Sequence, residues 1–231
     1  MKLYTSPLSP YSARVRASIY HKRLEVEMIK PSSIGGMTSP AFLAVTPIGK
    51  IPALVLDDGT LIAESDAIVE YLEDTVPTPS LRPKDPRLRA RARMLSRIVE
   101  LYVMGAVNDL STMMPIASNR RPLPRDDKLL GMHMPQLNKA LDSVETFLDG
   151  TGRYAIGAEL STADATLVAF LPFVRAVETY LGQDGLIERR SKLSACVSRL
   201  SEMPTLQRIF GEVSEAMQAR REEIRAKFGL A

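Results

Sequence analysis

A proline that directly precedes a short apolar run is the feature that most constrains this fold. Pro52 is followed by Ala53-Leu54-Val55-Leu56, a run typical of a buried strand. Because proline lacks a backbone N–H, it fits such a strand only at the first residue or in a tight turn, where its peptide bond can be cis. We therefore expect Pro52 to begin a strand and to leave the backbone N–H and C=O of Ile51 unpaired. Those two groups can pair with an extended peptide.

A hairpin and a helix follow this strand. Asp57-Asp58-Gly59 is a turn sequence between two apolar runs, and Glu64-Ser65 closes the second run. Residues 66–74 then have the pattern of a helix, with the acid and the serine at its start. The first turn of a helix offers free N–H groups and the positive end of the helix dipole. The start of this helix, at Glu64-Ser65, is therefore a predicted site for a carboxylate.

The amino-terminal segment places a hydroxyl at the start of another helix. Residues 2–5 have the pattern of a short strand, and residues 13–21 have that of a helix. Between them, Pro10 suits the first turn of the helix and Ser9 suits its N-cap. A second positive helix end therefore carries a hydrogen-bond donor.

In this order and spacing, the motifs resemble the glutathione-binding half of the cytosolic glutathione S-transferase family, which has a thioredoxin-like fold. The resemblance covers nearly the whole chain and is nearest to serine-type zeta, theta, delta-like and bacterial members. In that family the residue before a cis-proline pairs with the cysteinyl backbone of glutathione, and an acid-serine pair holds its γ-glutamyl end. The resemblance implies these roles for Ile51 with Pro52 and for Glu64 with Ser65. Lys50 is the candidate partner of the glycyl carboxylate.

The segment Ser9-Pro10-Tyr11-Ser12 resembles the Cys-Pro-Tyr-Cys of glutaredoxins with both sulfurs replaced by oxygen. Without these thiols it cannot form a mixed disulfide, so disulfide exchange is excluded. A hydroxyl can instead stabilise a substrate thiolate, which is the nucleophilic form of a thiol. A hydrogen bond to a charged group contributes roughly 1.5–3 kcal/mol, which lowers a thiol pKa by on the order of one to two units. The predicted chemistry is thus activation of glutathione as a co-substrate.

Several hydroxyls compete for this role. In serine-type transferases that resemble this chain, the active serine lies six residues before the valine of a Val-Arg pair, a spacing that here selects Ser9. Ser9 is the predicted catalytic residue. Ser12, one turn into the helix, is the second candidate and a further predicted glutathione-binding residue, and Ser6 is the third. A tyrosine-type mechanism through Tyr4 or Tyr11 is the alternative, disfavoured for Tyr4 because it falls on the strand.

Prolines divide the chain into two parts. Strands and helices alternate before a proline-rich segment, whereas apolar residues recur at helical spacing after it, with no hairpin signal. We predict an α/β thioredoxin-like amino-terminal domain followed by an all-α helical-bundle carboxy-terminal domain. The predicted bounds are 1–76 for the glutathione-binding domain, 77–86 for the linker and 87–231 for the acceptor-binding domain, with a loop at 118–127 between two long helices.

Two residues of the second domain are assigned to folding. Ser161 and Asp164 have the spacing of a capping box at the start of the central helix of the bundle, residues 165–174. Asp164 is therefore predicted to stabilise the core and not to act as a catalytic acid.

Cys196, the one cysteine, has apolar neighbours at helical spacing and is predicted to lie in the core. A single cysteine excludes an internal disulfide and a Cys-x-x-Cys motif.

Composition argues against several other functions. A net charge of +3 over 231 residues is modest for a nucleic-acid-binding protein, and two histidines leave little for a metal centre. No apolar run approaches the ~20 residues of a membrane span, and the amino-terminal segment lacks the apolar region of a secretory signal. We expect a cytoplasmic protein that uses no metal and has no nucleic-acid or membrane partner.

The resemblance implies conjugation of glutathione to a small apolar electrophile, by a homodimer. Methionines adapt to varied shapes, so the acceptor pocket is predicted at Tyr102, Met104, Met113 and Met114. One alternative is a glutathione-dependent isomerase of the maleylacetoacetate type, although the usual Ser-Ser-Cys start of that class is here Ser9-Pro10-Tyr11. Dehalogenation and ether cleavage are further reactions of the family. An alternative from another class is a non-catalytic scaffold that binds glutathione or other ligands.

Overall fold

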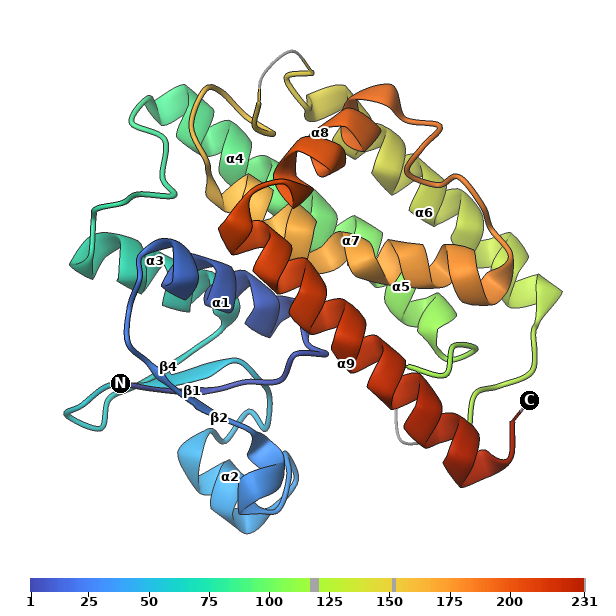
Figure 1. The fold of residues 1–231 in the computed structure, drawn as a ribbon, viewed down its shortest axis with the longest axis horizontal. Coiled ribbons are helices and arrows are strands. Elements are labelled where there is room, and N and C mark those ends of the chain that lie inside the picture. The colour runs from blue at the N-terminus through green and yellow to red at the C-terminus, as the bar shows by residue number, and fades with distance from the viewer. Residues whose placement is uncertain (117–120, 151–152, 231) are drawn as a thin grey trace. The chain divides into compact units, whose positions relative to one another are not determined.

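The computed structural model describes residues 1–116, 121–150 and 153–230, which form two compact units, Met1–Leu81 and Arg82–Ala231 (Figure 1). The first unit is α/β and the second is helical, which confirms the predicted fold class. The division falls inside the proline-rich segment 77–86. Within the described ranges, none of the helices combines the length and the hydropathy that a membrane crossing requires.

A four-stranded mixed sheet forms the first unit. Its strands are β1 (Lys2–Tyr4), β2 (Glu27–Ile29), β3 (Ala53–Val55) and β4 (Leu61–Ala63), in the order β2-β1-β3-β4. Strand β1 is parallel to β2 and antiparallel to β3, and β3 and β4 form the predicted hairpin. Leu3 lies opposite Leu54, which lies opposite Ile62, so apolar side chains of three strands come into register.

The helices of the first unit are α1 (Pro10–His21), the short 3-10 helix η1 (Pro31–Ile34), α2 (Pro40–Val45) and α3 (Ser65–Thr75). Figure 1 shows α1 and α3 side by side on one face of the sheet and α2 on the other. The core lies between that sheet face and the two long helices. It consists of Leu3, Val15, Ile19, Leu54, Ile68, Val69 and Leu72.

A buried ion pair holds the end of the first unit. The Nζ of Lys22 lies 2.8 Å from a carboxylate oxygen of Glu73, and both side chains are almost completely buried. Lys22 also donates to the carbonyl oxygens of Val76 and Pro79, at 2.6 and 3.0 Å. Glu73 accepts from the backbone N–H of Leu81 at 3.1 Å. The pair thereby satisfies the backbone of the segment that follows α3, which has no regular structure of its own.

The second unit consists of helices around one buried helix. They are α4 (Pro86–Ile98), the π-helical segment η2 (Val99–Val103), α5 (Met104–Ser111), α6 (Asp127–Phe147), α7 (Thr162–Leu181), α8 (Ser191–Ser201) and α9 (Pro204–Phe228). Helix α7 packs against α4, α5, α8 and α9, and extends beyond the predicted 165–174 at both ends. The predicted loop at 118–127 has its first three residues outside the described ranges and its last residue, Asp127, at the start of α6.

The start of α7 is the predicted capping box. One carboxylate oxygen of Asp164 accepts from the Ser161 N–H and hydroxyl, both at 2.8 Å, and the other accepts from the Ala155 N–H at 2.7 Å. Asp164 and Ser161 have no exposed surface, so the box is a core feature. Cys196 is also buried, which raises the pKa of its thiol to about 12 and makes it a poor nucleophile.

The buried carboxyl of Asp164 leads to a pH prediction. Burial raises its pKa from 3.8 to about 6, so the folded state binds this proton more tightly than the unfolded state does. The resulting stabilisation is greatest below the unfolded pKa and is lost as the pH rises through 6. Asp164→Asn has no carboxyl to titrate at this position. Relative to that variant, we expect the wild type to lose about 2 kcal/mol of unfolding free energy as the pH rises from about 4 to about 7. Urea unfolding of both proteins across this range measures it, and parallel pH profiles would contradict it.

Candidate functional site

The turn before β3 presents a free backbone edge. The Ile51–Pro52 peptide bond is cis, Pro52 is buried and β3 begins at the next residue. The backbone N–H and C=O of Ile51 form no hydrogen bond with the described residues. Ile51 is half-buried, and Lys50 beside it is exposed. The arrangement provides one donor and one acceptor just before the first residue of β3, with a cation next to them.

The start of α3 combines an unusual backbone with a buried hydroxyl. Glu64 precedes the helix with φ 67° and ψ 123°, a conformation that is strained for a residue with a side chain. Its side chain is exposed, whereas Ser65, the first helical residue, is buried. The Oγ of Ser65 accepts a hydrogen bond from Nη2 of Arg14, and Asp66 forms an ion pair with the same guanidinium at 3.0 Å. The segment is therefore held by a contact to α1 that the sequence pattern did not reveal.

The start of α1 distinguishes among the competing serines. The Oγ of Ser9 accepts from the Ser12 N–H at 3.1 Å, and the Ser9 N–H donates to the Ser6 carbonyl at 3.1 Å. Ser9 is the N-cap and is half-buried. Because its oxygen accepts from the backbone, its own hydrogen remains available to an anion. Ser12 is completely buried, and its Oγ has no hydrogen-bond partner among the described residues.

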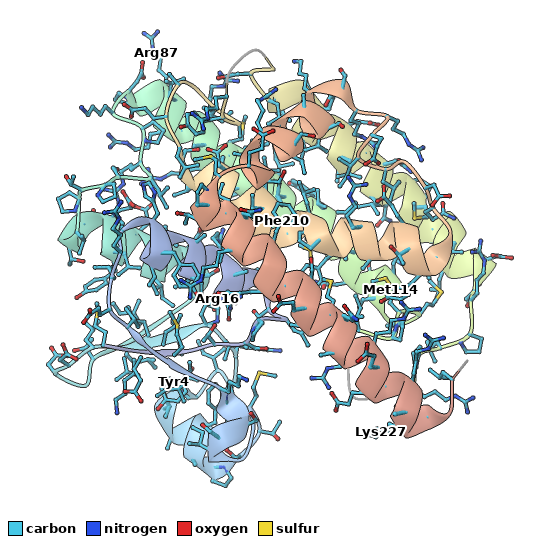
Figure 2. The ribbon with its side chains drawn as sticks, in the orientation of Figure 1. Tyr4, Arg16, Arg87, Met114, Phe210 and Lys227 are labelled. Carbon is cyan, nitrogen blue, oxygen red and sulfur yellow. The ribbon has the colours of Figure 1, made fainter. Side chains whose placement is uncertain are left out.

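The other candidate hydroxyls are placed differently. The Oγ of Ser6 accepts from the Leu8 N–H at 3.3 Å and so is part of the turn before α1. Tyr4, labelled in Figure 2, lies on β1 with its ring edge-on to Phe42 of α2, at 5.8 Å between centroids. Tyr11 is half-buried and lies on the first turn of α1. Among these groups, the hydroxyl of Ser9 best combines partial exposure with a fixed place at a helix end.

The predicted acceptor residues are distributed through the second unit. Met104, Met113 and Met114 are 2%, 6% and 3% exposed, whereas Tyr102, on η2, is 62% exposed. Buried methionines of this kind fill the helical core. None of the four lines the cavity that lies between α7 and α9 in this unit.

That cavity has a volume of about 420 Å³, and no sequence motif indicates it. Its walls include Arg175 and Tyr180 from α7 and Phe210, Met217 and Arg221 from α9 (Figure 2 labels Phe210). The guanidinium of Arg221 lies over the ring of Tyr180, 5.6 Å from its centroid. The α9 residues Phe210, Met217 and Arg221 recur at helical spacing. That spacing indicates that they face another helix, but it does not indicate that a cavity remains between the two helices.

The described part of the chain contains no cluster of side chains that could bind a metal ion. No group of three or more His, Cys, Asp or Glu side chains is close enough there to hold a metal ion. The turn before β3 and the starts of α1 and α3 offer hydroxyl, backbone and carboxylate groups. The hydroxyl and N–H donors suit the anionic groups of a peptide-like ligand, and the carboxylates suit an ammonium group.

Comparison with known proteins identifies the family. Residues 3–80 match the amino-terminal domain of glutathione S-transferases, and residues 124–209 match the carboxy-terminal domain. Maleylacetoacetate isomerase of Rattus norvegicus is 33% identical over 168 residues, covering 71% of this chain and 74% of that protein. The enzyme of the same name from Pseudomonas aeruginosa is 42% identical over 102 residues, but the match spans 48% of its length and 43% of this chain.

A solved structure supports the same assignment. Maleylacetoacetate isomerase from Methylobacterium extorquens, crystallised with malonate and glutathione, is 28% identical and has a TM-score of 0.71. The match covers 92% of this chain and 97% of that chain. The two domain matches, the rat relative and this structure all agree with an α/β first unit followed by a helical second unit. This chain therefore belongs to the glutathione S-transferase family, whose members are enzymes that use glutathione as a co-substrate.

Proposed function

We propose that this transferase binds glutathione along the first unit, activates its thiol through Ser9 and adds the thiolate to a small apolar electrophile. The observation that carries the proposal is the hydrogen bonding of Ser9. Its Oγ accepts from the Ser12 N–H, and its own hydrogen remains available for a sulfur anion at the start of α1. A hydroxyl that accepts one hydrogen bond becomes a better donor of the next.

Glutathione is proposed to bind at three points of the same unit. Its cysteinyl backbone pairs with the N–H and C=O of Ile51, as β-strand addition requires. Its γ-glutamyl group lies at the start of α3, held by Glu64 and Ser65, where the helix dipole favours the α-carboxylate. Lys50 is proposed to pair with the glycyl carboxylate. Pro52 shapes the turn, and Ser12 supplies the N–H that fixes Ser9.

The energetic requirement of thiol activation is small enough for one hydroxyl. A free thiol with a pKa of about 8.5 is only a few per cent thiolate near neutral pH. A charged hydrogen bond of roughly 1.5–3 kcal/mol lowers that pKa by on the order of one to two units. The thiolate then becomes a substantial fraction of the bound glutathione.

Isomerisation is a second candidate, favoured by the names of the relatives. The similar proteins described above from Pseudomonas aeruginosa, Rattus norvegicus and Methylobacterium extorquens are all maleylacetoacetate isomerases. A thiolate that adds to an activated double bond leaves a single bond that can rotate, and loss of the thiolate then restores the double bond in the other geometry. Both candidates share the activation step at Ser9. They differ in whether the sulfur stays on the product, and the acceptor residues Tyr102, Met104, Met113 and Met114 remain a prediction for either.

The proposal also includes the oligomeric state and the cellular location of the enzyme. Members of this family pair the first domain of one subunit with the second domain of another, and we propose a homodimer on that ground. A cytoplasmic location with a detoxification role is proposed in the same way. Size-exclusion chromatography with light scattering would measure the mass of the assembly, and a monomer would contradict the dimer.

Calorimetric titration with glutathione tests the binding proposal. We expect the wild type to bind, and Ser65→Ala to bind roughly 10- to 100-fold more weakly, because a charged hydrogen bond to the γ-glutamyl carboxylate is lost. Ser32→Ala, an exposed change in η1, is the matched control and should bind like the wild type. No heat from the folded wild type would overturn the proposal. Binding without turnover of either chlorodinitrobenzene or maleylacetoacetate would favour the non-catalytic scaffold.

A further inference from the structure

Two buried arginines on α1 lie behind the proposed glutathione site. Arg14 and Arg16 flank the fully buried Val15 and are only 1% and 3% exposed. Arginine is rarely buried unless it is paired, because removing its charge from water is costly. The groups that each guanidinium contacts therefore indicate the role of that arginine.

Arg14 reaches the start of α3. Its Nη2 donates to the Oγ of Ser65, a residue 51 positions away in the sequence, and its Nη1 pairs with Asp66 at 3.0 Å. Arginine has no hydrogen-bond acceptor, so the Ser65 oxygen must accept in this contact. The hydroxyl hydrogen of Ser65 is then available for another acceptor. At a helix N-terminus, the acceptor that fits is an anion.

Arg16, labelled in Figure 2, holds the segment that leads to Ser9. Its Nη1 donates to the Thr5 hydroxyl at 3.0 Å and to the Ser6 carbonyl at 2.9 Å. The same carbonyl accepts from the Ser9 N–H at 3.1 Å. The guanidinium therefore fixes one side of the turn whose other side carries the Ser9 hydroxyl.

We infer that the two arginines are positioning residues with separate tasks in the glutathione reaction. Arg14 acts through Ser65 and sets the affinity for the γ-glutamyl carboxylate. Arg16 acts through the turn before α1 and sets the acidity of the bound thiol. The inference rests on the proposed function and adds that two arginines of one helix affect different steps, binding and thiol activation.

Arg14→Lys tests the first task. Lysine keeps the charge but loses the planar fork that contacts Ser65 and Asp66 together. We expect the Kd of glutathione, measured by calorimetry, to rise about tenfold, with kcat toward chlorodinitrobenzene at saturating glutathione changed less than about twofold. In a Ser65→Ala background the same change should weaken binding much less, because the residue through which Arg14 acts is gone.

Arg16→Lys tests the second task. We expect the Kd of glutathione to change less than about twofold, while the thiol pKa in the complex rises by about one unit because the Ser9 hydroxyl is less well placed. The ultraviolet absorbance of the thiolate, titrated against pH in the protein-glutathione complex, measures this pKa. Arg23→Lys, an exposed change just after α1, is the control for both variants and should leave both quantities at their wild-type values.

The outcomes separate the inference from the proposed function. If the folded wild type does not bind glutathione, both fail. If it binds and Arg14→Lys and Arg16→Lys keep the wild-type Kd and thiol pKa, only the assignment of separate tasks fails, and it fails also if each variant changes both quantities equally. Should Arg14→Lys not fold, Asp66→Asn replaces it, because this side chain is 52% exposed and its loss loosens the same guanidinium. An unchanged Kd in a folded Asp66→Asn variant would overturn the task assigned to Arg14.

Discussion

Ser9→Ala is expected to lower kcat/KM for glutathione with chlorodinitrobenzene by roughly 10- to 100-fold, because it removes the charged hydrogen bond proposed between Ser9 and the thiolate. The pKa seen in the pH profile of kcat/KM should rise by on the order of one to two units, towards that of the free thiol. The Kd of glutathione should change little, since the contacts proposed for Ile51 and Ser65 remain. Alanine also removes the N-cap of α1, so the thermal stability of the variant must be measured in parallel.

Competing variants make the test specific. Ser12→Ala, Ser6→Ala and Tyr11→Phe remove the other hydroxyls near the start of α1. Ser9→Thr is the matched variant of Ser9, because threonine keeps both the hydroxyl and the capping oxygen and should retain much of the rate. A normal pKa in Ser9→Ala, or a larger loss in one of the competing variants, would remove Ser9 from the mechanism.

The parts of the site that the sequence revealed depend on local chemistry. A proline before an apolar run, a serine before Pro10 and an acid-serine pair after a hairpin are each determined by neighbours along the chain. The structure places all three at element boundaries of the first unit. The strand hairpin and the capping box of α7 were predictable for the same reason, because turn and cap preferences act over a few residues.

The parts that the sequence did not reveal depend on distant partners. Arg14 and Arg16 have no local feature that marks them as buried, and their contacts to Ser65 and to the turn at Thr5 appear only in the folded chain. The positive φ of Glu64 belongs to a residue type that does not favour it, so no composition rule signals it. Met104 could equally have lined a pocket or filled a core, and tertiary packing placed it in the core.

The buried pair of Lys22 and Glu73 is another long-range feature of the first unit. It joins α3 to the residue that follows α1, and it bonds the backbone at Val76, Pro79 and Leu81. Removing one partner leaves a buried charge without compensation, which is much worse than removing both. Among substitutions of single polar residues in this unit, we therefore expect the loss of one partner of this pair to lower the free energy of unfolding most.

Glu73→Ala is expected to destabilise the protein by about 3–5 kcal/mol, because the Lys22 ammonium would then lie in a dry site without its carboxylate. Urea unfolding, followed by amide hydrogen exchange in the first unit, measures the loss where it arises. Glu25→Ala, an exposed change between α1 and β2, is the control and should cost less than about 0.5 kcal/mol. The double variant Lys22→Met with Glu73→Gln removes both charges and should be more stable than Glu73→Ala. A loss below about 1 kcal/mol in Glu73→Ala would show that water or another group compensates Lys22, contrary to the burial of the pair.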